Sequence, residues 1–114
     1  MSVENVFFTP VSQLCHRDVV TCEQDQALVE VADMMRAHNI SSVVVCASQK
    51  PVGMVTDRDL RNKVVAQGLN PLELRARDIM NSPLVTIREN DYLFEALHLM
   101  SRRGIHRLCV VDDA

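Results

Sequence analysis

The chain has 114 residues, of which 47% are hydrophobic and 24% charged, and a net charge of −3. This length and balance are typical of one soluble globular domain and exclude a disordered chain. The acidic balance argues against a nonspecific nucleic-acid binder. Because no apolar run reaches the roughly 18 residues of a membrane span and no signal-peptide pattern is present, we expect a cytoplasmic protein.

The first third of the chain predicts a strand, a helix and a second strand. Residues 18–21 are a short apolar run with polar residues around it, which is typical of a strand. Residues 27–38 predict a helix, because apolar side chains recur at i, i+3, i+4 and i+7: Leu28, Val31, Ala32 and Met35. Asn39 stands where a left-handed residue often ends a helix. The continuous apolar run 42–46 favours a strand covered on both faces.

The middle of the chain adds a strand and a helix. Residues 49–51 predict a turn and residues 52–55 a third strand. A helix is expected over residues 57–67, starting near Thr56. The sequence Gly-Leu-Asn-Pro at 68–71 ends that helix.

The last third predicts strand, helix and strand again. Residues 83–86 and 107–111 are the apolar runs. Residues 92–103 predict a helix that ends before Gly104, with one apolar stripe formed by Leu93, Ala96, Leu97 and Met100.

These elements form an internal duplication at a shift of 65 residues, which carries 20–21 onto 85–86. The same shift relates several further pairs: Leu28 and Leu93, Glu30 and Glu95, Met35 and Met100, Ile40 and Ile105, Val45 and Val110. A short helix at 76–80 resembles the segment 11–14. We therefore divide the chain into a first repeat with its leading segment, 1–75, and a second repeat, 76–114. The second repeat is expected to lack its last strand and helix.

Residues 53–60, Gly-Met-Val-Thr-Asp-Arg-Asp-Leu, carry the clearest chemical signal. Gly53 allows a ligand or another backbone to approach closely. Thr56, at the helix start, offers a hydroxyl and free backbone N–H groups to a phosphate. Asp59 lies one turn later on the same side, where its carboxylate is able to accept hydrogen bonds from two ribose hydroxyls.

The same residues also have purely structural interpretations. Thr56 would be only an N-cap and Asp59 only a first-turn acid favoured by the helix dipole. The pair Asp57 and Asp59 suggests a metal site, but one helix turn without other clustered acids favours no metal. The cysteines lack CxxC spacing and are interpreted as small buried apolar residues rather than ligands: Cys15, Cys22, Cys46 and Cys109.

A doubled β-α-β-β-α unit that carries Gly-apolar-apolar-Thr-x-x-Asp resembles the cystathionine-β-synthase (CBS) domain pair, or Bateman module. The resemblance covers nearly the whole chain and includes the Val-Thr strands, the Ala-x-x-Met-x-x-x-x-Ile pattern at 32–40 and Gly-Ile-His-Arg-Leu at 104–108. It implies an α/β (α+β) fold of tandem repeats with pseudo-twofold symmetry, the second truncated. More loosely, residues 8–11, 56–61 and 64–69 resemble bacterial proteins that join a CBS pair to cyclic-nucleotide-binding and nucleotidyltransferase-like domains.

The resemblance implies a regulatory module, not an enzyme, that binds AMP, ADP or ATP between its repeats and controls an attached or partner domain. Asp59 would bind the ribose, and Thr56 a phosphate or ribose oxygen. From the second repeat, Leu84 and Ile105 would flank the adenine. Cationic or hydrogen-bonding groups for phosphates would come from Arg58, His106 and Arg107. The full implied set is Gly53, Thr56, Arg58, Asp59, Leu84, Val85, Thr86, Ile105, His106 and Arg107.

A second, symmetry-related cleft would use residues 19–21 and 40–42, but it lacks its own Thr-x-x-Asp, so we expect one site per chain. CBS pairs commonly associate through their helices, so a homodimer is expected. The alternative from another class is a ligand-free dimerisation scaffold. An RNA- or DNA-binding module would use the basic group at 102–107, which has no interleaved aromatic residues. No residue spacing suggests a catalytic constellation.

Overall fold

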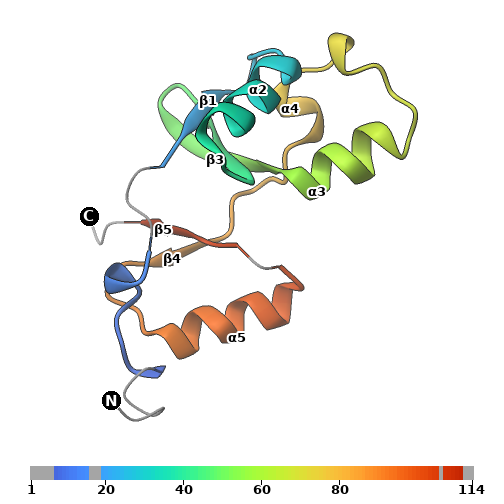
Figure 1. Cartoon of the computed structure of the whole chain (residues 1–114). Coiled ribbons are helices and arrows are strands. Elements are labelled where there is room, and N and C mark those ends of the chain that lie inside the picture. The colour runs from blue at the N-terminus through green and yellow to red at the C-terminus, as the bar shows by residue number, and fades with distance from the viewer. Residues whose placement is uncertain (1–6, 16–18, 106, 112–114) are drawn as a thin grey trace. The chain divides into compact units, whose positions relative to one another are not determined.

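A computed structural model describes residues 7–15, 19–105 and 107–111 (Figure 1). These residues form two compact units, and each is described by itself. Residues 19–84 form the first-repeat unit, and residues 7–15, 85–105 and 107–111 form the second-repeat unit. None of the helices within the described ranges is long and apolar enough to cross a membrane.

The first-repeat unit is built on a three-stranded sheet in the order β1-β2-β3. β1 (Thr21–Glu23) runs parallel to β2 (Ser42–Ala47), and β3 (Lys50–Thr56) runs antiparallel to β2. α2 (Leu28–His38) provides the crossover that two parallel neighbours require. β2 is therefore central, and its burial confirms the predicted strand covered on both faces: Val43, Val44, Val45 and Cys46 are all buried.

α2 packs its apolar stripe against this sheet. Its buried residues Leu28, Val31 and Met35 share a core with residues from all three strands and from the helices that follow: Cys22, Val43, Val45, Val55, Val64, Ala76 and Ile79. α2 ends at Asn39, whose φ of 52° confirms the predicted left-handed C-cap.

Short helical pieces follow β3. α3 (Asp57–Asp59) passes directly into the π-helix η2 (Leu60–Val65), in which the N–H of Ala66 donates to the carbonyl of Arg61, five residues back, at 2.8 Å. The 3-10 helix η3 (Pro71–Glu73) and α4 (Ala76–Ile79) complete the unit. The helix predicted over 57–67 is therefore confirmed in its start at Thr56, but it ends at Val65, and most of it is a π-helix, which apolar spacing over so few residues does not separate from an α-helix.

The second-repeat unit is smaller. β4 (Thr86–Arg88) and β5 (Cys109–Val111) form a two-stranded parallel sheet, connected by α5 (Leu93–Arg103), and η1 (Val11–Gln13) packs beside them. Gly104, with φ of 63°, confirms the second predicted C-cap. The core of this unit consists of Val11, Ile87 and Ala96, with Met100, Leu108 and Val110 packed against them.

Hydrogen bonds and strand register confirm the duplication. Thr21 pairs with Val44 in β1 and β2, and Thr86 pairs with Cys109 in β4 and β5, so both partners are displaced by 65 residues. The bond from Ile40 N–H to the Met35 carbonyl recurs between Ile105 and Met100.

The short helix before each repeat packs on the other repeat. In the first-repeat unit, Ala76 N–H of α4 donates to the Gln26 carbonyl at 3.0 Å. In the second-repeat unit, Val11 N–H of η1 donates to the Asp91 carbonyl at 2.8 Å, the equivalent contact after a shift of 65. The division of the sequence at residue 75 and the division of the structure into compact units therefore differ.

The observed strands differ in their limits from the predicted ones. β1 and β4 begin at the last residue of the runs 18–21 and 83–86, of which residue 18 lies outside the described residues. β5 begins at Cys109, not at residue 107. Strand pairing starts only where the neighbouring strand supplies partners, at Val44 opposite Thr21 and at Cys109 opposite Thr86, and an apolar run does not mark that point. The predicted turn also shifts, since Ser48 and Gln49 have positive φ while β3 already starts at Lys50.

Candidate functional site

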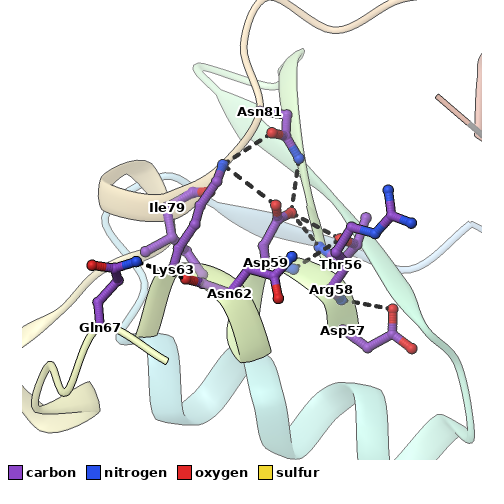
Figure 2. A network of polar contacts seen from close by, with 9 residues as sticks. All are labelled: Thr56, Asp57, Arg58, Asp59, Asn62, Lys63, Gln67, Ile79 and Asn81. Atoms are coloured by element: carbon purple, nitrogen blue, oxygen red, sulfur yellow. Dashed lines mark hydrogen bonds and ion pairs between the residues drawn. The ribbon is translucent and has the colours of Figure 1, made fainter. Parts of the chain in front are cut away.

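β3 ends at Thr56, which starts α3 through a reciprocal cap. The Thr56 hydroxyl accepts from Asp59 N–H at 3.2 Å, and Asp59 Oδ2 accepts from Thr56 N–H and from Thr56 Oγ1, both at 2.9 Å (Figure 2). This is a capping box with aspartate at the third helical position. The predicted N-cap and first-turn acid are both confirmed, and they place a carboxylate and a hydroxyl at the end of β3, an edge strand of its sheet.

The Asp59 carboxylate is buried and has further partners outside its own helix. The residue is 5% exposed. Asn81 Nδ2 donates to Asp59 Oδ2 at 2.8 Å, and Lys63 Nζ lies 3.3 Å from Asp59 Oδ1. A buried charge needs such compensation, because burial alone would strongly disfavour the ionised form.

Lys63 joins this carboxylate to the segment that leads toward the second repeat. Its ammonium donates to the Ile79 carbonyl and to Asn81 Oδ1, both at 2.9 Å. Asp59 is its third partner, through an ion pair. Figure 2 shows the Asp59 carboxylate, the Lys63 ammonium and the Asn81 amide directed toward one another.

Gly53 is required by a close approach of backbone. A Cβ at this position would lie 2.7 Å from the Asn81 carbonyl oxygen and 2.9 Å from Met80 Sδ. Asn81 also pairs with Met54 through two backbone hydrogen bonds, of 2.9 and 3.1 Å. Of the two explanations offered by the sequence, a nearby backbone is confirmed.

Arg58 lies on the exposed side of α3. Its N–H donates to Asp57 Oδ1 at 2.8 Å, and Figure 2 shows its guanidinium pointing away from the Asp59 carboxylate. It is thus accessible to an anion in solution without disturbing the capping box.

The residues expected from the second repeat lie at the starts of two neighbouring strands. Val85 and Thr86 enter β4, and the Val85 carbonyl accepts from Cys109 N–H of β5 at 3.1 Å. Ile105 and Arg107 are half-buried between α5 and β5, and His106 lies outside the described residues. Leu84, half-buried, is the last residue of the first-repeat unit. The structure therefore brings Gly53, Thr56 and Asp59 together in one unit and Val85, Thr86, Ile105 and Arg107 in the other.

Sequence reasoning missed Lys63 and Asn81. Lys63 follows Asp59 by four residues, a spacing at which acid and base pair on a helix, so a signal was present. Asn81 is 22 residues from Asp59, and no local pattern connects them.

Two cysteines confirm the prediction of small buried apolar residues. Burial raises the pKa of the Cys22 thiol to about 11, with smaller contributions from Cys46 and Glu23. Burial, followed by Glu23, also raises the pKa of Cys46. Cys15 and Cys109 are half-buried. Among the residues that the structure describes, no cluster of three His, Cys, Asp or Glu side chains is arranged to hold a metal ion.

Comparison with known proteins links these features to one family. The model of the CBS domain matches twice, over residues 11–66 and 76–114. An uncharacterized protein of Methanopyrus kandleri is 46% identical over 104 residues, which are 90% of this chain and 53% of that protein. The CBS domain-containing protein YhcV of Bacillus subtilis is 33% identical over 95 residues, 83% of this chain and 67% of that protein. The chain thus spans about half the length of the Methanopyrus relative.

A solved structure supports the same assignment. A CBS domain protein of Pyrobaculum aerophilum complexed with AMP superposes with a TM-score of 0.82 at 29% identity, covering 92% of this chain and 80% of that one. The duplicated fold, the capped Thr-x-x-Asp corner and the two family matches agree, and the chain belongs to the CBS-domain family as a CBS pair.

Proposed function

We propose that this chain is a non-catalytic regulatory module that binds an adenine nucleotide and thereby controls an attached or partner domain. The Pyrobaculum relative complexed with AMP supports the choice of ligand. A ligand shifts a regulated equilibrium only through different affinity for its states, so nucleotide binding must favour one arrangement of the module.

The observation that carries the proposal is the Thr56–Asp59 corner. A carboxylate that is 5% exposed is held at the end of β3 beside a threonine hydroxyl. In the proposed complex, Asp59 accepts hydrogen bonds from the ribose hydroxyls, and Thr56 contacts a phosphate or ribose oxygen. Leu84 and Ile105 flank the adenine, with Val85 and Thr86 beside them. The phosphates are met by Arg58, His106 and Arg107.

The second candidate function is the ligand-free dimerisation scaffold. It is favoured by the partners that Asp59 already has in Thr56, Lys63 and Asn81. In that account the corner only ends a strand and starts a helix. The two functions are distinguished by whether any adenine nucleotide binds.

Calorimetric titration of the chain with AMP, ADP and ATP tests the proposal. We expect saturable binding with a stoichiometry near one nucleotide per chain, and the order of the three affinities reports how many phosphates the site accommodates. Lack of binding by folded protein, verified by circular dichroism, would leave the scaffold as the function.

We further propose that the chain forms a homodimer through the outer face of α5. Phe94 and Leu97 are 43% and 42% exposed, and Phe94 contacts the rings of Phe8 and Tyr92 at centroid distances of 5.5 and 6.2 Å. Such a patch is unusual on an isolated soluble unit. α5 has Glu95 in its first turn and basic residues at 102–103 in its last turn, so two antiparallel copies would match opposite charges.

Light scattering after gel filtration tests this interface. Leu97→Asp should convert a dimer to a monomer, because it buries a charge at the centre of the paired helices. Leu72→Asp is the matched control, since Leu72 is 78% exposed on η3 of the other unit. A dimer that persists in Leu97→Asp, or a monomeric wild type, contradicts the interface.

A further inference from the structure

Both oxygens of the Asp59 carboxylate already have partners. Oδ2 accepts three hydrogen bonds, two from Thr56 and one from Asn81, and Oδ1 faces the Lys63 ammonium. An ionised carboxylate offers about four lone-pair sites. Two ribose hydroxyls are therefore unable to bind Asp59 unless at least one present partner leaves.

The partners differ in how readily they leave. The Thr56 N–H donates to Oδ2 as part of the capping box of α3, and loss of this bond would leave a backbone N–H of a buried helix start unpaired, whereas the bond from the Thr56 hydroxyl to Oδ2 joins two side chains. Lys63 is held by two hydrogen bonds and by its ion pair with Asp59. Rotation of the Asn81 side chain breaks two hydrogen bonds, its own to Asp59 Oδ2 and the one its Oδ1 accepts from Lys63 at 2.9 Å. Because Asn81 is exposed, water is able to replace both partners, so this contact to Oδ2 is released at the smallest cost.

Asn81 belongs to the segment that leads from α4 to β4. This segment is attached to β3 by the two backbone bonds between Asn81 and Met54, and by Ser82 Oγ, which donates to the Val52 carbonyl at 3.0 Å. Release of the Asn81 side chain removes the bond that connects this segment to the buried carboxylate (Figure 2).

We propose that Asn81 is an intramolecular competitor for Asp59, so that nucleotide binding displaces the Asn81 amide and loosens the segment between the repeats. This inference rests on the proposed function. Because the ligand and the Asn81 amide compete for one carboxylate, ligand binding would act directly on the segment that connects the first repeat to the second. Reciprocity requires that a weaker Asn81 contact strengthens nucleotide binding by the same factor.

Calorimetric titration with AMP of wild type, Asn81→Ala and Ser82→Ala tests the competition. A hydrogen bond to a charged group corresponds to roughly a tenfold change in an equilibrium constant, so Asn81→Ala should lower the Kd for AMP about tenfold. Ser82→Ala is the matched control, because it removes a contact of the same segment that does not involve Asp59. Its Kd should equal that of wild type.

Three results would overturn parts of the account separately. Unchanged or weaker AMP binding by Asn81→Ala, with wild type binding, overturns the competition alone. If Ser82→Ala lowers the Kd for AMP as much as Asn81→Ala does, the effect does not come from the contact with Asp59, and that contact loses its role in the competition. Absence of AMP binding in all three proteins overturns the proposed function together with the competition.

Hydrogen exchange of wild type gives a readout that needs no variant. The amide of Asn81 donates to the Met54 carbonyl at 2.9 Å, and we expect its exchange to accelerate at saturating AMP, relative to amides within β2. Unchanged or slower exchange of this amide in the complex contradicts the proposal.

Discussion

Replacement of Gly53 by alanine probes the contact between β3 and the segment that follows α4. The added Cβ would lie 2.7 Å from the Asn81 carbonyl oxygen, a backbone atom, and 2.9 Å from the flexible Met80 side chain. Met80 is able to move, whereas the Asn81 carbonyl is held by its hydrogen bond from Met54 N–H at 3.1 Å. The clash must therefore shift backbone.

The expected cost follows from opposing terms. Alanine restricts the unfolded chain and favours folding by about 0.4–1 kcal/mol. Overpacking typically costs about 1–3 kcal/mol, and each of the two bonds between Met54 and Asn81, if lost, about 1 kcal/mol more. We expect a net loss of about 1–3 kcal/mol in the free energy of unfolding.

Urea denaturation of wild type and Gly53→Ala measures this loss, provided that the m-value is unchanged. Gly53→Ala should also destabilise the Met80→Ala protein, although by less than it destabilises wild type. The smaller loss reflects removal of the Met80 side chain, and the remaining loss reflects the Asn81 carbonyl, which stays in place. An alanine variant as stable as wild type would refute the steric reasoning. No loss in the Met80→Ala protein would assign the clash to Met80 alone.

Three other properties follow from the structure. Lys63→Met leaves the Asp59 charge without its cation, but the Lys63 side chain is 41% exposed, so solvent screening keeps the effect small. We expect the free energy of unfolding in urea titration to fall by about 1–2 kcal/mol. Unchanged stability would contradict the compensation of Asp59 by Lys63. The raised pKa of Cys22 means that folding favours the protonated thiol, so the stabilisation is fully present below the ordinary thiol pKa and falls as pH rises from 9 toward 11. In thermal melts over this pH range, Cys22→Ala should lose less stability than wild type, and an equal loss would refute the assignment to Cys22. Gly104→Ala should cost about 1 kcal/mol in urea titration because φ is 63°, whereas Asn39→Gly should be nearly neutral; the reverse order would contradict the two C-caps.

Local patterns made much of this fold predictable. The stripe from Leu28 to Met35, the C-cap at Asn39 and the shift of 65 residues depend on neighbours along the chain, and the structure confirms them. The reciprocal cap of Thr56 and Asp59 was predictable for the same reason, since three residues separate its partners.

Contacts between distant segments were not predictable. Asn81 reaches Asp59 across 22 residues, and its importance depends on a backbone course that no local pattern encodes. The segments at 11–14 and 76–80 are equivalent by sequence, so their similarity does not indicate which repeat each one covers. Tertiary packing alone decides that α4 joins the first-repeat unit and η1 the second.

The most direct test of the central proposal compares Asp59→Asn with Asp78→Asn in calorimetric titration with AMP. Asp78 is the matched control, because it occupies the same helical position in α4 and accepts from Arg75 N–H at 2.7 Å, but lies outside the Thr56–Asp59 corner. We expect Asp78→Asn to bind like wild type and folded Asp59→Asn to bind at least roughly tenfold more weakly, since it loses charge-assisted bonds to the ribose. Equal AMP affinity in wild type and folded Asp59→Asn would contradict a nucleotide site centred on Asp59.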